Sequence, residues 1–321
     1  MTTPVLQVQH LSKSFPVTRG FLHRTRAELR AVDDVSLDVQ PGETLCVVGE
    51  SGCGKSTLGK LVLRLLEPTA GRILIEGQDV TALSAEAMRP FRRRVQMVFQ
   101  DPYASLNPRL SAAEIVTEPL ENFEPLRAAD RRERAADLLA RVGLRPDLLD
   151  RMPFEFSGGQ RQRLGIARAL CLHPALIVAD EPVSALDVSV QAQVLNLLLD
   201  LQEEFGLAYL FISHDLGVVE HIGQRIAVMY LGRIVELADR DALFGAPQHP
   251  YTEALLAAAP LPDPRARRTQ PIVEGEVPSP LDPPPGCPFH PRCPYAEPRC
   301  RTEVPALRRL ADGRLAACHL R

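Results

Sequence analysis

The sequence has no run of 18 or more apolar residues, so no segment is expected to cross a bilayer as a helix. The N-terminal residues Met-Thr-Thr-Pro-Val-Leu-Gln do not place a charged segment before an apolar one, which argues against a secretory signal. The formal net charge of −3 provides no basic surplus, and nucleic acid is therefore not expected as a partner. No internal repeat is visible. What remains is an ordinary globular composition, with 45% hydrophobic and 24% charged residues.

The 321 residues are enough for one large α/β domain and an appendage. The first hundred residues are predicted to be rich in β-strands. One strand begins at Val5, a second covers Val32–Val39, and a short buried strand covers Thr44–Val48. Apolar residues at three- and four-residue spacing then predict a helix over Lys55–Leu66.

The stretch from about 105 to 172 differs in composition, because strand-like runs vanish and arginine and alanine dominate. Ala128–Val142 and Ser157–Leu172 are predicted helices, which indicates a helical subdomain inserted into the sheet domain. Strand-like runs return on both sides of a predicted helix at Val188–Phe205. These runs are Ala175–Ala179, Ala208–Ile212, Arg225–Met229 and Arg233–Leu237. Such alternation predicts a largely parallel sheet with crossover helices.

The composition changes again after about residue 245. A short helix is predicted from His249 onward. Prolines then accumulate between 260 and 285, and this density predicts an extended connector because proline is excluded from helix interiors and central strands. We therefore expect a first domain over 1–245 and a C-terminal extension over 246–321.

A glycine-rich loop follows the strand Thr44–Val48. The segment Gly49-Glu-Ser-Gly-Cys-Gly-Lys-Ser56 fits the pattern G-x-x-x-x-G-K-S and lies between a strand and a helix, as that pattern requires. Backbone N–H groups and the start of the following helix favour phosphate binding. Lys55 is expected to reach the β- and γ-phosphates of a nucleotide, and Ser56 to bind Mg²⁺. The predicted nucleotide-binding residues here are Gly49, Glu50, Ser51, Gly52, Cys53, Gly54, Lys55, Ser56 and Thr57.

Two acidic residues follow an apolar strand in the second half of the chain. Asp180 ends the run Leu-Ile-Val-Ala-Asp, and Glu181 comes directly after it. A carboxylate at the C-terminal end of a buried strand can hold Mg²⁺ through water. The next carboxylate can polarise the water that attacks a phosphate, so Asp180 and Glu181 are predicted to serve nucleotide hydrolysis.

The residues Phe156–Ala167 lie between these two motifs and contain Ser-Gly-Gly-Gln. Because this motif opens a predicted helix, it offers N–H groups and a helix dipole to an anion. Together the three motifs resemble those of ATP-binding cassette (ABC) ATPases. The resemblance implies a P-loop, RecA-like α/β nucleotide-binding domain with an antiparallel β subdomain. It also implies that the nucleotide site of a second cassette is completed by Ser157, Gly158, Gly159 and Gln160.

The same resemblance implies roles for four single residues. Gln100 would contact Mg²⁺ and the attacking water, and His214 would contact the γ-phosphate. Phe15 would stack on adenine, and Asp187 would anchor a loop that crosses the dimer interface. The implied catalytic residues are thus Glu181, His214 and Gln100, and the implied Mg²⁺ ligands are Ser56, Gln100 and Asp180.

Two further segments narrow the resemblance to one branch of the family. Gln100–Arg109 and His249–Leu256 resemble the dipeptide/oligopeptide/nickel importers of bacteria, in particular their second ATPase subunit. This implies an ATP hydrolase that energises peptide uptake from the cytoplasmic face of the bacterial membrane, where it is peripheral. The implied partners are two membrane permeases, a second cassette in a heterodimer or homodimer, and indirectly an extracellular solute-binding protein.

Other functions stay open at this point. The cassette could serve nickel or another small solute, or it could be a soluble ATPase without a role in transport. A ribosome-acting cassette protein would usually carry two cassettes, and a chromosome-maintenance ATPase would carry a long coiled coil. The sequence has neither. A metal- or redox-sensing role of the C-terminal tail is a further alternative.

The tail contains four of the seven cysteines, spaced C-x5-C-x6-C-x17-C. The odd number, the lack of a signal and the nucleotide loop predict a reducing cytoplasm, which excludes secretory disulfides. Because the tail is poor in apolar residues, a cross-linking metal centre is expected. Four thiolates suit a 4Fe–4S cluster, which the family resemblance favours, or Zn²⁺; free thiols are the other alternative. The predicted ligands are Cys287, Cys293, Cys300 and Cys318, with His290 and His319 in reserve.

Overall fold

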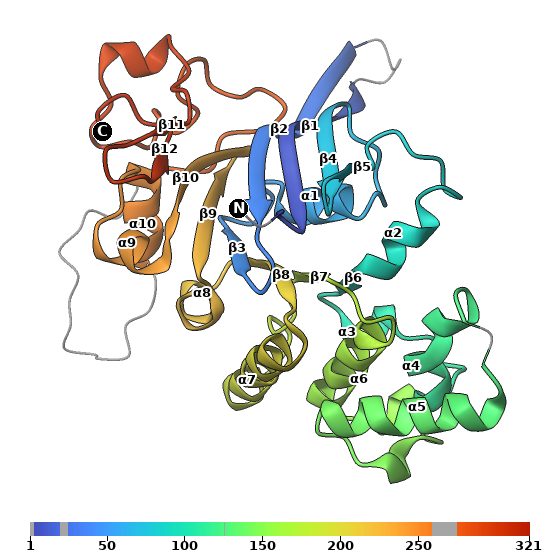
Figure 1. Cartoon of the computed structure of the whole chain (residues 1–321). Helices are drawn as coiled ribbons and strands as arrows, with labels where there is room; N and C mark the ends of the chain where they lie inside the picture. The colour runs from blue at the N-terminus through green and yellow to red at the C-terminus, as the bar shows by residue number, and fades with distance from the viewer. Residues whose placement is uncertain (1–2, 20–24, 125, 259–274) are drawn as a thin grey trace. The chain divides into compact units, whose positions relative to one another are not determined.

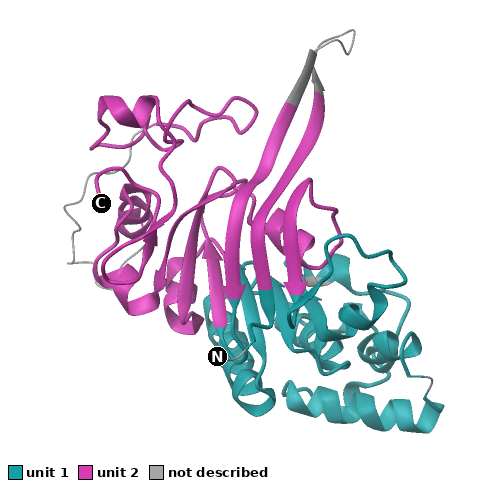
Figure 2. Cartoon of the chain, turned by 45° about the horizontal axis from the view of Figure 1, so that its top comes forward, with its two compact units in different colours: residues 1–6, 39–43, 75–212 teal, residues 7–38, 44–74, 213–321 magenta. Residues whose placement is uncertain are grey.

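The computed structural model describes residues 3–19, 25–124, 126–258 and 275–321. It divides into two compact units, shown in different colours in Figure 2. Unit 1 comprises Met1–Leu6, Val39–Glu43 and Ile75–Ile212. Unit 2 comprises Gln7–Asp38, Thr44–Leu74 and Ser213–Arg321. Each unit is therefore assembled from segments that are distant in the sequence.

Unit 1 contains three parallel strands in the order β8, β7, β6. They are β6 (Val95–Val98), β7 (Leu176–Asp180) and β8 (Ala208–Ser213). Every residue of β7 and β8 is buried, as is usual for parallel strands covered on both faces. The short strand β5 (Gln78–Asp79) also belongs to this unit.

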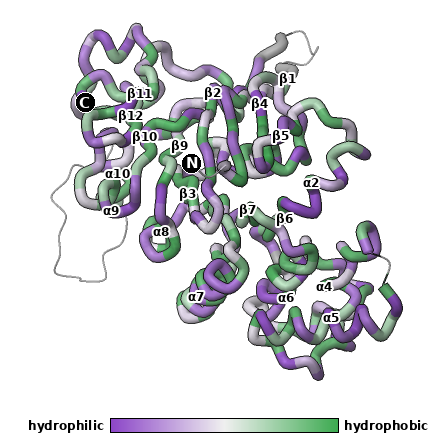
Figure 3. The backbone as a smooth tube through the Cα atoms, viewed as in Figure 1, coloured by the Kyte–Doolittle hydropathy of each residue, from purple (hydrophilic) through white to green (hydrophobic). Residues whose placement is uncertain are grey.

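The helices of unit 1 begin with α2 (Arg89–Arg94), which Figure 3 shows as strongly hydrophilic, and α3 (Pro102–Ser105). Helix α4 packs against both α5 and α6 (Figure 1), within the stretch for which the sequence predicts a helical subdomain. Leu138 and Leu139 of α5 are buried. The remaining bounds are α4 (Ala112–Glu121), α5 (Ala128–Arg141), α6 (Gly158–Leu170), α7 (Val188–Phe205) and the 3-10 turns Pro146–Leu148 and Pro153–Glu155.

Unit 2 contains two groups of strands. The first has the order β2, β1, β4, formed by β1 (Leu6–Arg19), β2 (Thr25–Val39) and β4 (Ala70–Ile75). The second has the order β11, β12, β10, β9, β3. Its members are β3 (Thr44–Val48), β9 (Arg225–Tyr230), β10 (Arg233–Asp239), β11 (Arg308–Arg309) and β12 (Leu315–Ala316).

The pairing within the second group joins the start of the chain to its end. Strand β3 is parallel to β9, whereas β10 is antiparallel to both β9 and β12. The tail strand β12 places Ala316 opposite Glu236. The tail therefore extends a group of strands that also contains β3, the strand that leads into the glycine-rich loop. The helices of unit 2 are α1 (Lys55–Val62), α8 (Leu216–Ile222), α9 (Arg240–Gly245), α10 (Pro250–Ala258) and the 3-10 turn Pro298–Arg301.

Several bounds differ from those predicted from the sequence. Strand β3 and helix α7 have the predicted ends, but α1 stops at Val62 rather than Leu66. The backbone at Arg64 is left-handed, with φ 52°, and this conformation cannot continue a right-handed helix. Much of the predicted proline-rich connector, 259–274, lies outside the described residues. Within the described ranges, no helix has the length and apolar character needed to cross a membrane.

Candidate functional site

The glycine-rich loop 49–54 joins β3 to α1 in unit 2. Gly54 has φ 109°, and a Cβ atom there would lie 2.0 Å from the carbonyl oxygen of Ala31. Both the conformation and the close approach thus require glycine. The Lys55 ammonium is buried and donates hydrogen bonds to the carbonyl oxygens of Gly49, at 2.7 Å, and Glu50, at 3.0 Å. The loop therefore wraps around a positive charge at the start of a helix, an arrangement that suits a phosphate.

Other loop residues differ in their exposure. Ser51 and Gly52 are exposed, whereas Ser56 and Thr57 at the start of α1 are half-buried. Burial raises the pKa of the Cys53 thiol, which lies 3.8 Å from the Lys55 Nζ. A buried neutral thiol is inert and serves as a small packing group.

The carboxylates predicted for hydrolysis lie at the end of β7 in unit 1. Asp180 is the last residue of the strand and is buried. Glu181 follows in a left-handed conformation with φ 47°, which is uncommon for a residue with a side chain and is typical of functional sites. The Gln100 Nε2 donates a hydrogen bond of 2.8 Å to the Glu181 Oε2. Residues predicted separately from two motifs are therefore in direct contact.

The Ser-Gly-Gly-Gln motif forms a capping box at the start of α6. The Ser157 hydroxyl accepts from the Gln160 N–H at 3.4 Å, and the Ser157 N–H donates to the Gln160 Oε1 at 3.0 Å. A Cβ atom at Gly159 would lie 2.4 Å from the Val190 Cγ1 of α7, so the second glycine allows two helices to approach. The S-x-x-Q spacing is typical of a capping box. The sequence-based prediction, which considered only anion binding, did not include this structural role.

The remaining predicted residues lie in both units. Phe15 is in β1, half-buried, with the Lys13 Nζ 5.1 Å from its ring centroid. His214 is exposed between β8 and α8, and Asp187 is exposed directly before α7. Unit 1 thus contains Gln100, Ser157, Gly158, Gly159, Gln160, Asp180, Glu181 and Asp187, whereas unit 2 contains Phe15, residues 49–57 and His214.

Two residues beside the phosphate loop are absent from the sequence-based prediction. Arg292 binds the Glu50 carboxylate through two hydrogen bonds, and the Tyr251 hydroxyl accepts from the Glu50 N–H. The hydrogen bonds to Glu50 raise the pKa of Arg292 above its ordinary value. Tyr251 lies in His249–Leu256, which resembles a segment of one family branch, and Arg292 lies in the cysteine-containing tail. Nothing local in either segment indicates its contact with the loop.

The prediction of a metal centre in the tail is wrong. Among the residues that the structure describes, no group of three or more His, Cys, Asp or Glu side chains is arranged to hold a metal ion. This finding removes both the 4Fe–4S cluster and the Zn²⁺ alternative formed by Cys287, Cys293, Cys300 and Cys318.

The tail is folded by packing on the rest of unit 2. Phe289 is 1% exposed, and its ring centroid lies 5.4 Å from that of Tyr230 and 5.4 Å from that of Tyr251. Strand β12 pairs with β10, and the Ala317 N–H donates to the Val235 carbonyl. The expected reserve ligands contact carbonyl oxygens: His290 that of Cys287 and His319 that of Glu303. A metal centre was predicted because the tail has too few apolar residues for a core of its own, but the tail packs on β9, β10 and α10 of unit 2.

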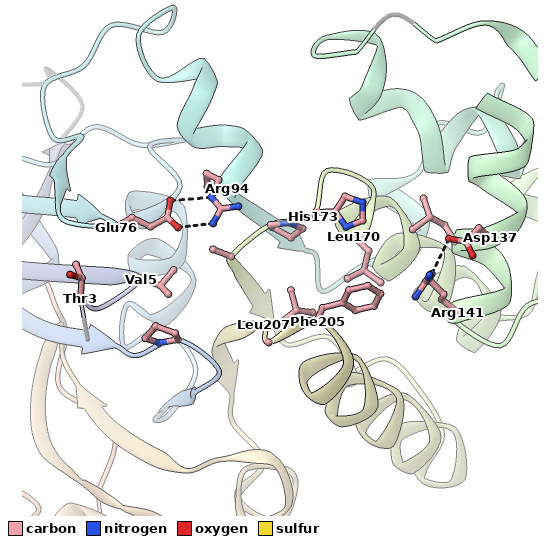
Figure 4. A pocket seen from close by; sticks show the side chains of 15 residues that line it. Thr3, Val5, Glu76, Arg94, Asp137, Arg141, Leu170, His173, Phe205 and Leu207 are labelled. Atoms are coloured by element: carbon pink, nitrogen blue, oxygen red, sulfur yellow. Dashed lines mark hydrogen bonds and ion pairs between the residues drawn. The ribbon is translucent and has the colours of Figure 1, made fainter. Parts of the chain in front are cut away.

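A cavity of about 480 Å³ in unit 1 contains none of the predicted site residues (Figure 4). Its basic side chains are paired with acids, since Arg94 binds Glu76 and Arg141 binds Asp137. Burial lowers the pKa of His173, and the neighbouring arginines lower it further. The charges of these two pairs are therefore compensated and not available to a ligand. The phosphate loop and the Gln100–Glu181 pair are better candidates for the functional site.

Comparison with known families yields two matches. Residues 32–184 match the ABC transporter family, and residues 235–300 match the family described as oligopeptide/dipeptide transporter, C-terminal region. The first match contains the phosphate loop, the Ser-Gly-Gly-Gln motif, Asp180 and Glu181, and the second contains Tyr251 and Arg292.

Individual relatives are similar over nearly the full length. A protein of Sinorhizobium fredii described as a probable peptide ABC transporter ATP-binding protein is 63% identical over 100% of this chain and 91% of its own length. The oligopeptide transport ATP-binding protein AppF of Bacillus subtilis is 52% identical, over 98% of this chain and 97% of AppF. Among solved structures, the cassette MJ0796 bound to ADP and Pi is similar with a TM-score of 0.66 and 30% identity, covering 73% of this chain and 98% of that one.

Proposed function

Because this chain belongs to the ATP-binding cassette transporter family, we propose that it hydrolyses ATP to energise the import of peptides across a membrane. The observation that carries the peptide assignment is the match of residues 235–300 to the oligopeptide/dipeptide C-terminal region. The names of full-length relatives at 63% and 52% identity support the same substrate class. The family also implies ATP and Mg²⁺ as ligands.

The residues of the phosphate loop fit a nucleoside triphosphate. Lys55 holds its ammonium over the loop carbonyls, from which it can turn toward phosphate oxygens, and the amides at the start of α1 add partial positive charge. Ser56, Gln100 and Asp180 would hold Mg²⁺, which supplies charge neutralisation at the phosphates when bound. His214 would contact the γ-phosphate and Phe15 the adenine.

Glu181 is proposed as the base that polarises the attacking water. Its carboxylate follows a rigid buried strand and is held by the Gln100 amide, so its position is defined before the substrate binds. The Ser157–Gln160 segment opens a helix and would serve the nucleotide of a second cassette, with Asp187 near the same interface.

The proposed setting is the cytoplasmic face of the cell membrane. The chain would bind two membrane permeases and pair with a second cassette, in a heterodimer if the operon supplies a related ATPase. Peptides would reach the permeases from an extracellular binding protein. The finding of a C-terminal region shared with peptide transporters supports this arrangement over a soluble cassette without transport.

Reconstitution tests this function. The chain is combined with the permeases and second ATPase encoded beside it, in proteoliposomes that contain ATP. Uptake of labelled di- and oligopeptides is measured with the binding protein outside. ATP-dependent peptide uptake supports the proposal. ATP hydrolysis that responds to nickel but not to peptides would assign the chain to another solute, and failure to bind any permease would point to a non-transport ATPase.

A further inference from the structure

Glu50 of the phosphate loop is bound by a residue of the C-terminal tail. The Arg292 guanidinium donates to both carboxylate oxygens of Glu50, with Nη1–Oε2 2.8 Å and Nη2–Oε1 2.9 Å. The Arg292 side chain is only 9% exposed, and that of Glu50 is 30% exposed. A bidentate pair in this geometry is among the stronger polar contacts in proteins. Removal of the arginine would leave a partly buried carboxylate without its counter-ion.

The backbone of Glu50 is held from the same side. Its N–H donates to the Tyr251 hydroxyl at 2.8 Å, and Tyr251 is buried. The His249 Nδ1 accepts from the Tyr251 N–H at 3.0 Å, which fixes the start of α10. The buried Glu236 carboxylate of β10 accepts in turn from the N–H groups of Gln248 and His249, each at 2.8 Å. A continuous series of hydrogen bonds thus connects β10 to the phosphate loop.

Two aromatic rings pack against the Arg292 guanidinium and hold it in position. The Arg292 Cζ lies 5.8 Å from the ring centroid of Phe289 and 6.0 Å from that of Tyr230. Tyr230 in turn lies 4.6 Å from Tyr251, measured between ring centroids. The residues that position Arg292 and Tyr251 therefore form one cluster, and its members come from β9, α10 and the tail.

The charge of Glu50 is unfavourable for the proposed ligand. A triphosphate is strongly anionic, and a carboxylate in the loop that receives it repels it unless a cation compensates. Arg292 provides that cation from outside the loop. Since the Lys55 Nζ also donates to the Glu50 carbonyl, a shift of Glu50 would displace the lysine as well. Both the neutralisation of the Glu50 carboxylate and the position of the loop thus depend on the tail.

We propose that Arg292 and Tyr251 are positioning residues of the ATP site. They neutralise and fix Glu50, so that the C-terminal region is a functional part of the phosphate loop and sets its affinity for nucleotide. The inference rests on the proposed function of the loop in binding ATP. It assigns a physical role to His249–Thr252, part of a segment that resembles one branch of the family, and to Pro288–Cys293 of the tail.

Titration of the full-length chain with a non-hydrolysable Mg²⁺–ATP analogue tests the proposal. Arg292→Met is expected to raise the Kd about five- to tenfold, because a desolvated carboxylate is left unpaired beside the phosphates. Addition of Glu50→Gln to that variant removes the unpaired charge. The double variant is expected to bind the analogue at least about threefold more tightly than Arg292→Met alone. Tyr251→Phe, which loses the acceptor for the Glu50 N–H, is expected to weaken binding about two- to fivefold.

Arg299→Met is the matched control, because Arg299 is an exposed tail arginine whose side chain is paired with Glu303, away from the phosphate loop. Arg292→Lys keeps the charge without the bidentate contact and is titrated as well. It still tests the proposal if the methionine variant folds poorly. A Kd within twofold of wild type for both Arg292 variants overturns the proposal. So does an Arg292→Met deficit that Glu50→Gln leaves unchanged, since that indicates general disruption. Lys55→Ala in the same titration distinguishes failure of this proposal from failure of the proposed function. If Lys55→Ala binds the analogue like wild type, the loop itself is not a nucleotide site.

Discussion

The Gln100 side-chain amide donates a hydrogen bond of 2.8 Å to the Glu181 carboxylate. These residues are 81 positions apart and follow two neighbouring parallel strands, β6 and β7. Parallel strands end at the same edge of a sheet, and the contact between the two side chains follows from that topology. The amide holds one carboxylate oxygen of Glu181 in place, at a residue whose backbone is already constrained by its left-handed conformation.

Glu181→Gln is therefore expected to lower steady-state ATP hydrolysis about 10²–10⁴-fold, the usual range for a positioned general base. Size and hydrogen bonding are retained, but an amide cannot accept a proton from water. Binding of ATP is expected to persist. The measurement is phosphate release under saturating MgATP, with nucleotide affinity determined in parallel. A variant that hydrolyses ATP within threefold of wild type would exclude Glu181 as the base.

Lys55→Ala is expected to weaken nucleotide binding, because a charge-assisted contact with two phosphates is lost. The wild-type ammonium is buried and also donates to two loop carbonyls, so the loop itself loses support. Equilibrium binding of labelled ATP measures the effect, and Lys60→Ala on the exposed face of the same helix serves as the control. Equal affinity of the Lys55 variant and wild type would contradict the phosphate-binding role.

Ser157→Arg is expected to leave ATP binding by the single chain nearly normal but to block ATP-driven dimerisation, since the proposed phosphate partner belongs to the opposite subunit. Dimer formation is followed by size-exclusion chromatography with MgATP in a Glu181→Gln background. Ser157 is also the N-cap of α6, so Ser157→Ala is needed to separate loss of the cap, which costs about 1 kcal/mol, from the bulk and charge of arginine. An arginine variant that dimerises as readily as wild type would refute the role in trans.

Stability is expected to depend on pH through His249. Burial lowers the pKa of this imidazole to about 3 in the folded chain, from an ordinary value of 6.5. Between these values the unfolded chain binds a proton that the folded chain excludes. The free energy of unfolding therefore falls as the pH drops below about 6.5, by up to about 1.4 kcal/mol per pH unit.

Urea titrations between about pH 7 and pH 5 measure this dependence. His249→Asn keeps an acceptor for the Tyr251 N–H but has no titratable group, so its unfolding free energy is expected to change less over the same interval. Because all other titratable groups are common to both chains, the difference between the two slopes isolates His249. Parallel pH curves for the wild type and the variant would show that His249 is not held neutral by its surroundings.

Motifs that are complete within a short segment were predictable from the sequence. The strand, the glycine-rich loop and the helix around Lys55 are contiguous, and so are β7 and the carboxylates that follow it. Their chemistry depends on local backbone geometry, which residue types such as glycine and buried apolar runs report directly. The same holds for α7, whose predicted and observed ends coincide.

Elements with weak local patterns were not predictable to the same degree. Strands β11 and β12 contain two residues each and exist because β10 offers an edge for pairing. Nor could the sequence show that Gly159 has a structural role in addition to the proposed one, since that role depends on the distance to Val190 in another helix.

The tail shows the limit most clearly. Its composition and cysteine spacing predicted a metal centre, because the segment has too few apolar residues to form a hydrophobic core of its own. Phe289 and Ala316 instead pack against or pair with residues of β9, β10 and α10. The nucleotide-binding motifs could be recognised in the sequence, because each is a contiguous segment whose residue types report its local backbone geometry. The ion pair of Arg292 with Glu50 could be found only in the folded chain, because it joins residues 242 positions apart and neither segment carries a local signal for it.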